Sequence, residues 1–412
     1  MTDTGKQTPL GALVMAGEGQ TEATRITDTI FMVKDISNAY LVTTADGDLL
    51  VNTGFLGNGP KTKALFAPHR TGPLKHIIVT QSHADHYGAL PEQLEPETQV
   101  IVGVGFTETA AYFDKLDTFL KRRSGKLWAS MTRRGGPPPP VPVVMPDLEV
   151  STHHAFEQGG RKFEVVKTPG GETLCAVFVW MPDERTVFTG NLFGPVWRAM
   201  PNLVTIRGDR PRLVRAYLKS VEEVRALSPD LLITGHGEPI HGADRIRADL
   251  DTMHAAVSWI EAQTIAGMNA GKTVHELMRE IVLPDDLTIG QFHGKTSWVV
   301  RAIWEENAGW LHYEDGTTAL YGVPRSAVNA DLAELAGVDA LARRAQDHVE
   351  AGRPLEAIHL LDVALSAAPE NLAALKIKKI ALDHLLVASG NINLSETMWL
   401  KSEIAAIETA LT

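Results

Sequence analysis

The sequence predicts an α/β layered domain followed by an all-helical region. Short β-branched runs alternate with helical patterns up to about residue 240, and almost every segment from Ala243 onward has a helical pattern. The composition agrees, because 412 residues with 44% hydrophobic and 22% charged side chains can bury a large core. These numbers exclude a disordered chain and a small disulfide-stapled one.

Strand and helix signals follow one another through the first half of the chain. Asp46 and Gly47 mark a turn between two β-branched runs. We expect strands at Thr29–Val33, Ala39–Thr44, Leu49–Asn52, His76–Thr80, Gln99–Val102, Lys162–Thr168, Ala176–Trp180, Thr186–Phe188 and Leu231–Thr234. Helices are expected at Lys61–Ala67, from about Tyr87, at Thr107–Trp128 and at Arg212–Leu227. The proline-rich segment 133–142 predicts a surface loop, because it can neither continue a helix nor donate a ladder.

The second half of the chain predicts helices only. They are expected at Ala243–Ala266, Val274–Glu280, Lys295–Trp310, Asp331–Glu350, Pro354–Ala367, Leu372–Ala388 and Glu396–Leu411. The small residues and prolines around Ala351 and Pro369 are typical of a tetratricopeptide-like helix pair, which cannot bury its own face and would dock on a partner. A plain helical bundle fits the same pattern.

The net charge, the hydropathy pattern and the cysteine content limit the kinds of partner and metal site that the chain can have. A formal net charge of −11 argues against a nucleic-acid binder. No apolar stretch reaches the roughly 18 residues of a membrane helix, so we expect no membrane partner and a cytoplasmic location. The single cysteine, Cys175, allows neither an internal disulfide nor a cysteine-based metal cage.

One short segment carries most of the chemistry. Residues 80–88 read TQSHADHYG and directly follow a predicted buried strand. A loop that leaves a strand end can bring alternate side chains to one point, and His83, Asp85 and His86 are ligands that suit zinc or iron. The segment therefore predicts a metal site. The pair His153 and His154, by contrast, is more typical of chance in a chain with 15 histidines.

The histidine segment resembles the His-x-His-x-Asp-His motif of the metallo-β-lactamase fold, an αββα sandwich. Two further positions agree with the pattern of that fold in order and spacing. They are the strand end at Asn52 and the late histidine His236 in Thr-Gly-His-Gly. The resemblance implies a metal site on loops at one edge of the two sheets.

A narrower resemblance is to the type III alkylsulfatases. The segment 168–172, TPGGE, resembles the stretch that supplies a glutamate ligand, here Glu172, and 202–208, NLVTIRG, resembles their sulfate-contacting segment, here with Arg207. His293 falls where those enzymes have an aromatic site residue. The helices from about residue 325 resemble their dimerisation domain, which implies a homodimer, whereas their sterol-carrier-like domain is not expected here.

This resemblance implies four parts of the chain. They are an N-terminal extension (1–24), a metallo-β-lactamase-like catalytic domain (25–242), its helical continuation (243–323) and a dimerisation domain (324–412).

Three departures from the family pattern change the implied ligand set. Gln81 stands at the first motif histidine, Asn52 at an early aspartate, and Gly190 at a metal-bridging glutamate. One half-site then keeps His83 and Glu172 with Gln81 as a weak third ligand, and the other keeps Asp85, His86 and His236. We expect the second of these to bind zinc, or iron, more tightly and the first to be weak or empty, so that one or two ions bind per chain.

The resulting hypothesis is a metal-dependent hydrolase of an ester-type bond, with a sulfate ester of a small molecule as the first expectation. A divalent ion with an open coordination position makes water reactive near neutral pH. Asp85 would bind the ion and orient that water, Glu172 would accept its proton, and Arg207 would bind an anionic head group through its planar guanidinium.

Two alternatives remain open at this stage. The changed ligand set could serve another reaction, such as lactone, carboxylic ester, ether or amide hydrolysis, or iron chemistry. The domain could also be a binding module without catalysis.

Overall fold

A computed structural model describes residues 7–132 and 140–412, apart from the side chains of residues 129–132. The predicted loop at 133–142 therefore lies largely outside the described residues. The chain divides into two compact units, Met1–Gly125 with Ala129–Glu306, and Lys126–Trp128 with Asn307–Thr412.

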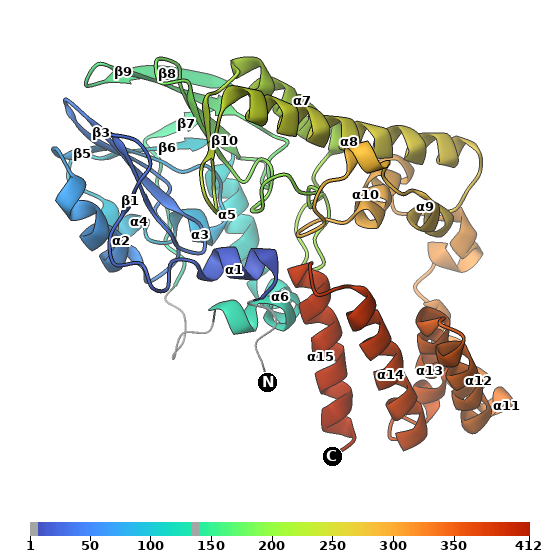
Figure 1. Ribbon diagram of the computed structural model, residues 1–412. Helices are drawn as coiled ribbons and strands as arrows, with labels where there is room; N and C mark the ends of the chain where they lie inside the picture. The colour runs from blue at the N-terminus through green and yellow to red at the C-terminus, as the bar shows by residue number, and fades with distance from the viewer. Residues whose placement is uncertain (1–6, 133–139) are drawn as a thin grey trace. The chain divides into compact units, whose positions relative to one another are not determined.

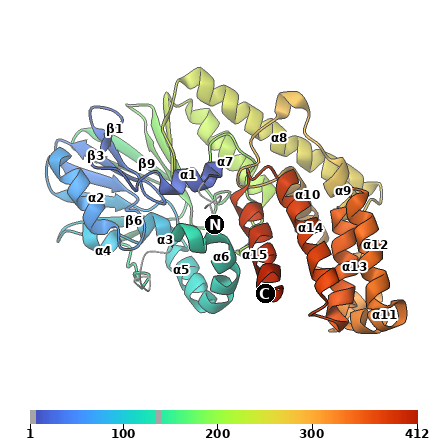
Figure 2. The same ribbon diagram turned by 60° about the horizontal axis from the view of Figure 1, so that its bottom comes forward.

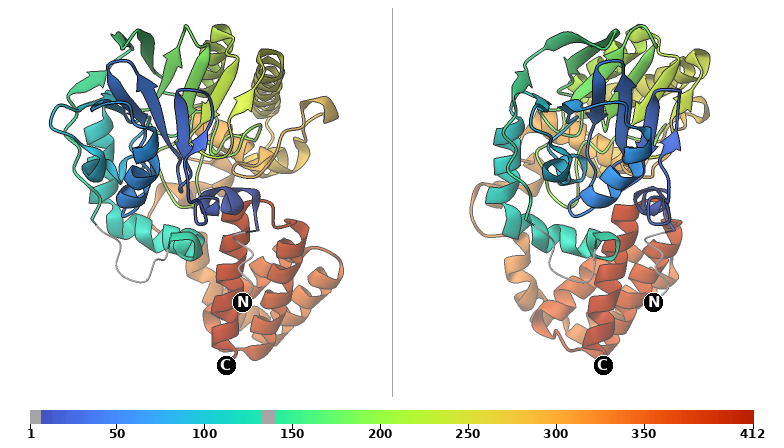
Figure 3. Two further views of the ribbon diagram at one scale, coloured as in Figure 1. Left: turned by 60° about the vertical axis from the view of Figure 1, so that its left-hand side comes forward. Right: turned by 90° about the vertical axis from the view of Figure 1, so that its left-hand side faces the viewer.

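The first unit contains two mixed sheets (Figure 3). The first sheet follows chain order: β1 (Thr24–Arg25), β2 (Ile30–Val33), β3 (Ala39–Thr44), β4 (Gly47–Val51), β5 (Leu74–Ile78), β6 (Gln99–Gly103) and β7 (Leu148–Val150). The second sheet has the order β13 (Ile240–His241), β12 (Leu231–Thr234), β11 (Thr186–Gly190), β10 (Val177–Met181), β9 (Arg161–Lys167) and β8 (His153–Gln158). β4 runs parallel to β5, and β11 runs parallel to β12.

Alternate side chains of the central strands pack on opposite faces. In β3, Tyr40 and Val42 join a core that also contains Val177 and Val179 of β10, so this core lies between the two sheets. Leu41, one residue along, belongs instead to a core that the first sheet shares with the helices outside it. Because both faces are covered, these strands read as nearly continuous apolar runs.

Helices cover the outer face of each sheet (Figure 1). Those packed on the first sheet are α2 (Gly59–Phe66), α3 (Ala84–Tyr87), α4 (Leu90–Gln93) and α5 (Phe106–Lys115). Beside the second sheet lie α7 (Val214–Leu227) and α8 (Ala243–Asn269), and α9 (Val274–Glu280) and α10 (Thr296–Ala308) extend the core that these helices form. The unit also contains α1 (Pro9–Met15) and the 3₁₀ turns η1 (Ala67–His69) and η2 (Asp285–Leu287). The result is an αββα sandwich.

The second unit is helical (Figure 2). Its elements are η3 (Tyr313–Asp315), η4 (Thr317–Leu320), η5 (Arg325–Val328), α11 (Asn329–Ala336), α12 (Val338–Glu350), α13 (Pro354–Ala367), α14 (Leu372–Ala388) and α15 (Leu394–Ala410). Small buried residues such as Ala345, Ala357 and Ala381 let α12, α13 and α14 approach closely. A second cluster joins α14 to α15 through Leu382 and Ile404.

The predicted fold class is confirmed, and two predicted helices need correction. The helix expected at Thr107–Trp128 is interrupted at Leu116, where α5 ends and α6 (Asp117–Thr132) begins. The helix expected at Asp331–Glu350 is divided at Gly337, whose φ of 82° is a left-handed conformation that ends α11. β8 was not predicted from the sequence; in it, His153 pairs with Glu164 and His154 stacks on Phe156.

Among the described residues, every helix is too short or too polar to cross a lipid bilayer.

Candidate metal centre

The site is built where the parallel strands end. Asn52 follows β4, the segment from Thr80 to His86 follows β5, Asn191 follows β11 and His236 follows β12. Because the carboxyl ends of parallel strands lie at the same edge of their sheet, the two sheets bring these polar residues together. All of them belong to the first unit.

Asp85, His86 and His236 form a convergent group. Their ligand atoms all lie within 4.8 Å of one another, the arrangement expected of residues that could hold a metal ion. The Asp85 Oδ2 atom lies 3.6 Å from His86 Nε2 and 3.8 Å from His236 Nε2. Burial lowers the pKa of His86 to about 4, so its imidazole is neutral. One carboxylate and two imidazoles fit a divalent transition metal and leave room for a further ligand.

Contacts on the far side of the His86 ring fix its direction. Its Nδ1 atom lies 3.0 Å from Ser37 Oγ and 3.1 Å from Asn52 Nδ2. Across the ring, the Nε2 atom lies 2.7 Å from Gln81 Nε2. The ring is completely buried. Because Nδ1 is held by Ser37 and Asn52, the Nε2 atom on the other side of the ring faces Asp85.

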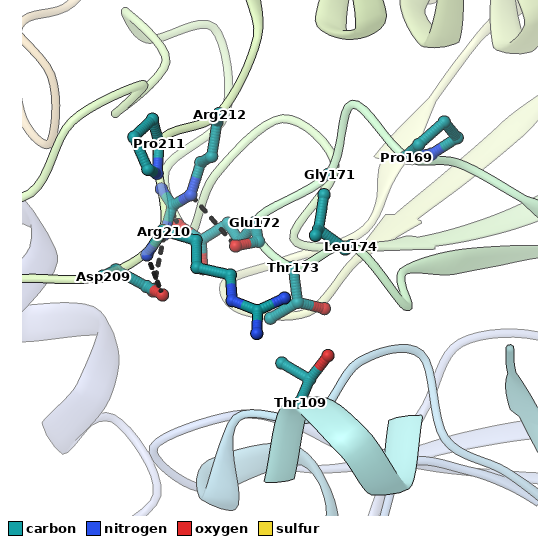
Figure 4. A pocket seen from close by; sticks show the side chains of 10 residues that line it. All are labelled: Thr109, Pro169, Gly171, Glu172, Thr173, Leu174, Asp209, Arg210, Pro211 and Arg212. Carbon is teal, nitrogen blue, oxygen red and sulfur yellow. Dashed lines mark hydrogen bonds and ion pairs between the residues drawn. The ribbon is translucent and has the colours of Figure 1, made fainter. Parts of the chain in front are cut away.

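Glu172 belongs to a second, differently built group. Its Oε1 atom lies 3.1 Å from His293 Nε2 and 3.4 Å from Arg212 Nη1. Its Oε2 atom accepts a hydrogen bond from Asn191 Nδ2 at 3.0 Å and lies 3.5 Å from His83 Nδ1. Both carboxylate oxygens therefore already have partners, and one of them is a guanidinium (Figure 4).

A carboxylate outside the predicted set neutralises the arginines. Asp209 Oδ2 lies 3.6 Å from a terminal nitrogen of Arg207 and the same distance from one of Arg212, and 3.3 Å from His83 Nε2. Burial alone would raise the pKa of Asp209, but His83 and the two arginines lower it to about 2. Likewise burial would raise the pKa of Glu172, yet Arg212 and the histidines hold it well below its usual range. Both carboxylates are therefore ionised.

His83 is surrounded by charge. Burial favours its neutral form, but hydrogen bonds with Asp209 and Glu172 outweigh burial and raise its pKa. Gln81 Nε2 lies 3.2 Å from its Nδ1 atom, and Arg207 Nη2 lies 3.4 Å from its Nε2 atom. A metal ion here would have to displace these partners and sit beside two guanidinium groups.

Asn191 joins the two groups. Its Nδ2 atom, which donates to Glu172, also lies 3.1 Å from His236 Nε2. The neighbouring Gly190 has φ of 52°, and an added Cβ would lie 2.5 Å from Thr80 Oγ1. A side chain at Gly190 would therefore require Thr80 to move. The side chain that lies between Glu172 and His236 is the amide of Asn191, the next residue.

The structure brings together all eight residues singled out from the sequence. The six ligand candidates Gln81, His83, Asp85, His86, Glu172 and His236 form one contact network, which Arg207 and His293 join. Sequence reasoning missed the parts of Asn191, Asp209 and Arg212. Asp209 and Arg212 follow Arg207 within five residues, so the charged run 207–212 was the signal available in the sequence.

Residues 32–236 match the family model of the metallo-β-lactamase superfamily, so this part of the chain is a metallo-β-lactamase domain, and the match ends on His236. Further along, the family model "Alkyl sulfatase dimerisation" matches residues 273–402. Together the two models account for most of the chain.

Relatives and solved structures agree with these matches. An alkyl/aryl-sulfatase (BDS1) of Saccharomyces cerevisiae is 25% identical over 395 residues, which cover 88% of this chain and 60% of that protein. A linear primary-alkylsulfatase of a Pseudomonas species is 27% identical over 241 residues, covering 57% of this chain and 44% of that protein. The sec-alkylsulfatase Pisa1 from Pseudomonas sp. superposes with a TM-score of 0.81 at 22% identity over 94% of this chain and 65% of that one, which shows the fold.

Proposed function

We propose that this protein is a metal-dependent hydrolase that cleaves sulfate esters of small molecules. Asp85, His86 and His236 would hold one divalent cation, for which zinc is the first candidate. The observation that carries the proposal is the convergence of these three donors, two of them buried and one partly exposed, in a metallo-β-lactamase domain. The alkylsulfatase relatives support a sulfate ester as the substrate class. The chain spans 60% and 44% of the length of those relatives.

A single cation is favoured over two by the surroundings of Glu172. Binding of a second ion to Glu172, His83 and Gln81 would require Arg212 and Asn191 to release the carboxylate. Arg212 is itself buried and fixed by its hydrogen bond to the Glu172 carbonyl at 3.0 Å. Its positive charge lies where a second cation would have to bind, and like charges in a buried site repel strongly.

Each residue of the site would have its own role in the reaction. A divalent cation supplies positive charge that polarises a substrate oxygen and acidifies water. Asp85 lies beside both imidazoles and keeps them oriented toward one point, and it accepts a hydrogen bond from the attacking water. Glu172, kept ionised by Arg212, is one amide away from His236 and can take up a proton from that water. Its low pKa makes it a weak base, so orientation of the water is its larger contribution.

Arg207 and His293 are the proposed contacts for the anionic head group. Arg207 is partly exposed, lies beside His83, and presents a planar guanidinium that can bind two oxygens at once. His293 is anchored to Glu172 and to Asn202 Nδ2, which lies 3.2 Å away. These residues would place the ester beside the water that Glu172 orients.

One observation favours a second candidate, hydrolysis of a carboxylic ester or lactone. The guanidinium of Arg207 already lies beside Asp209, so part of its charge is neutralised before any sulfate arrives. A less charged substrate would not compete with Asp209.

We further propose a homodimer formed through the C-terminal helices, on the basis of the dimerisation family model. A sedimentation mass equal to one chain at micromolar concentration would contradict it. The cytoplasmic location and the four domain boundaries named above stay predictions. Cell fractionation and limited proteolysis test them.

Sulfate release from alkyl sulfates of several chain lengths tests the proposed activity. We expect release with zinc-loaded protein and none after treatment with a chelator. Matched carboxylic esters and lactones serve as the comparison. Release of acid from these, with no sulfate from any alkyl sulfate, would replace the sulfatase proposal by the second candidate. Elemental analysis of the same preparation identifies zinc or iron and their number per chain.

A further inference from the structure

The side chain of Asn52 has a fixed direction. Its Oδ1 atom accepts hydrogen bonds from the Thr80 backbone N–H at 2.9 Å and from the Thr80 hydroxyl at 3.0 Å. A backbone N–H can only donate, so the oxygen of the amide must face Thr80. The amide nitrogen of Asn52 must then face His86, and it lies 3.1 Å from the Nδ1 atom.

This direction decides which ring nitrogen of His86 carries the proton. An amide N–H beside Nδ1 requires Nδ1 to be the acceptor, and a neutral imidazole then carries its proton on Nε2. Ser37 permits either tautomer, because its hydroxyl lies 3.0 Å from Nδ1 and 3.1 Å from the Gly235 carbonyl oxygen: it can donate to Nδ1, or donate to the carbonyl and accept the proton of Nδ1. The Asn52 N–H can only donate, so it is the group that favours the Nε2–H form. Nε2 is the atom that faces Asp85.

Gln81 completes the arrangement. The end of its side chain lies 2.7 Å from His86 Nε2, and its Oε1 atom has no hydrogen-bond partner among the described residues. Exchanging the amide oxygen and nitrogen, which have nearly the same shape, lets Oε1 accept the proton on Nε2. The chain Thr80, Asn52, His86, Gln81 is then consistent at every hydrogen bond.

We propose that Asn52 is a positioning residue that holds His86 in the Nε2–H tautomer, capped by Gln81, and thereby weakens the affinity of the metal site. The inference rests on the proposed function, since the site in question is the group of Asp85, His86 and His236. A cation binds at Nε2 only when the proton leaves that nitrogen. If the proton moves to Nδ1, it meets the N–H of Asn52.

An aspartate at position 52 would reverse this preference. One oxygen would keep the two hydrogen bonds from Thr80, and the other would accept the proton of Nδ1, leaving the Nε2 lone pair free for a metal. Partners of this kind typically change metal affinity by about 10 to 100-fold. We therefore expect Asn52→Asp to bind zinc at least about ten-fold more tightly than the wild type.

The uncharged variant Asn52→Ala separates the tautomer from the added charge. It removes the N–H beside Nδ1 without adding a carboxylate, so that Ser37 Oγ can accept the proton of Nδ1. We expect zinc binding several-fold tighter than in the wild type. Asn269→Asp, at an exposed position in α8, carries the same change of charge outside the site and should leave the affinity unchanged.

The test has two measurements on the full-length protein. Zinc affinity is measured by chelator competition, and the tautomer of His86 is read from the ¹⁵N shifts of ¹⁵N-histidine-labelled, metal-free protein. The expected results are an Nε2–H tautomer in the wild type, an Nδ1–H tautomer in Asn52→Asp, and the affinity order just given.

Other outcomes separate this inference from the proposed function. An Nδ1–H tautomer in the wild type, or Asn52→Asp and Asn52→Ala that bind zinc no more tightly than the wild type, would overturn the inference and leave the metal site in place. If no protein binds zinc or iron, the proposed function fails, and the tautomer measurement alone still decides the role of Asn52. That measurement needs only the wild type, so it stands if a variant does not fold.

Discussion

Two groups of candidate ligands come from one loop and differ in their neighbours. Asp85 and His86 converge with His236, and the side chains nearest to them are neutral amides and hydroxyls. Gln81 and His83, only a few residues earlier, lie with Glu172 in a cluster that also holds two guanidinium groups and the Asp209 carboxylate.

The comparison shows that the identity of ligands alone does not define a metal site. Glu172 is buried and ionised, as a good ligand would be, yet each of its oxygens already has partners. In the first group the carboxylate and imidazoles face one another with no opposing cation among the described contacts. Fixed charge around the ligands decides which group can take a divalent ion.

The largest expected effect is that of His236→Ala. Removal of one of three ligands should weaken zinc binding by at least about 100-fold, since a change in an outer partner alone costs about 10 to 100-fold, and should abolish hydrolysis. Isothermal titration gives the affinity. His153→Ala, at an exposed histidine of β8 that pairs with Glu164, is the matched control. Equal zinc affinity in both variants would contradict the assignment of the site.

Glu172→Gln tests whether this residue serves as a ligand or as a group that orients water. We expect kcat to fall by about 10²-fold, because the amide replaces one acceptor oxygen by a donor and can neither orient the water in the same way nor accept its proton, while zinc affinity stays within about ten-fold of the wild type. The measurement is sulfate release at saturating substrate together with zinc titration. A loss of zinc binding as large as that of His236→Ala would place Glu172 among the ligands and remove the difference between the two groups.

Arg212→Ala should destabilise the second group. Without this guanidinium the buried carboxylates of Glu172 and Asp209 lose a shared cation, which should cost about 3–5 kcal/mol of unfolding free energy. Urea denaturation measures the change. Arg207→Ala is the control, because Arg207 lies at the same distance from Asp209 but is partly exposed, so its loss should cost less than about 1 kcal/mol. Equal costs would show that Arg212 does not hold the group together.

The smallest expected effect is that of Gly190→Ala. The new methyl group would lie 2.5 Å from Thr80 Oγ1, at a left-handed backbone position. We expect a loss of about 1–3 kcal/mol in unfolding free energy, measured by urea denaturation against Gly160→Ala. Gly160 also has a positive φ, but its added Cβ meets no atom within 4 Å. If both variants lose the same stability, the close approach to Thr80 is not what keeps position 190 a glycine.

The parts of the fold that follow from local pattern could be predicted from the sequence. The strands at Ala39–Thr44 and Leu231–Thr234 are apolar runs buried on both faces, and their bounds agree with the prediction. The interruptions at Leu116 and Gly337 were missed, although Gly337 is a recognisable helix terminator. β8 was missed because its exposed residues alternate with partly buried ones around two histidines.

The candidate site followed from one dense motif, and its surroundings did not. Asp85 and His86 are adjacent in sequence, so their convergence could be inferred from a loop at a strand end. Asp209 and Arg212 act on residues about 40 to 125 positions earlier, and pairing over such distances leaves no local pattern. The direction of the Asn52 amide depends on a backbone N–H of another strand end and is visible only in the structure.

The most direct test of the account is an anomalous difference map from crystals of zinc-loaded protein. We predict one peak bonded to Asp85 Oδ2 and to the Nε2 atoms of both His86 and His236, while Glu172 remains in contact with Arg212. Two peaks bridged across both groups, or a lone peak on His83 and Glu172, would contradict it.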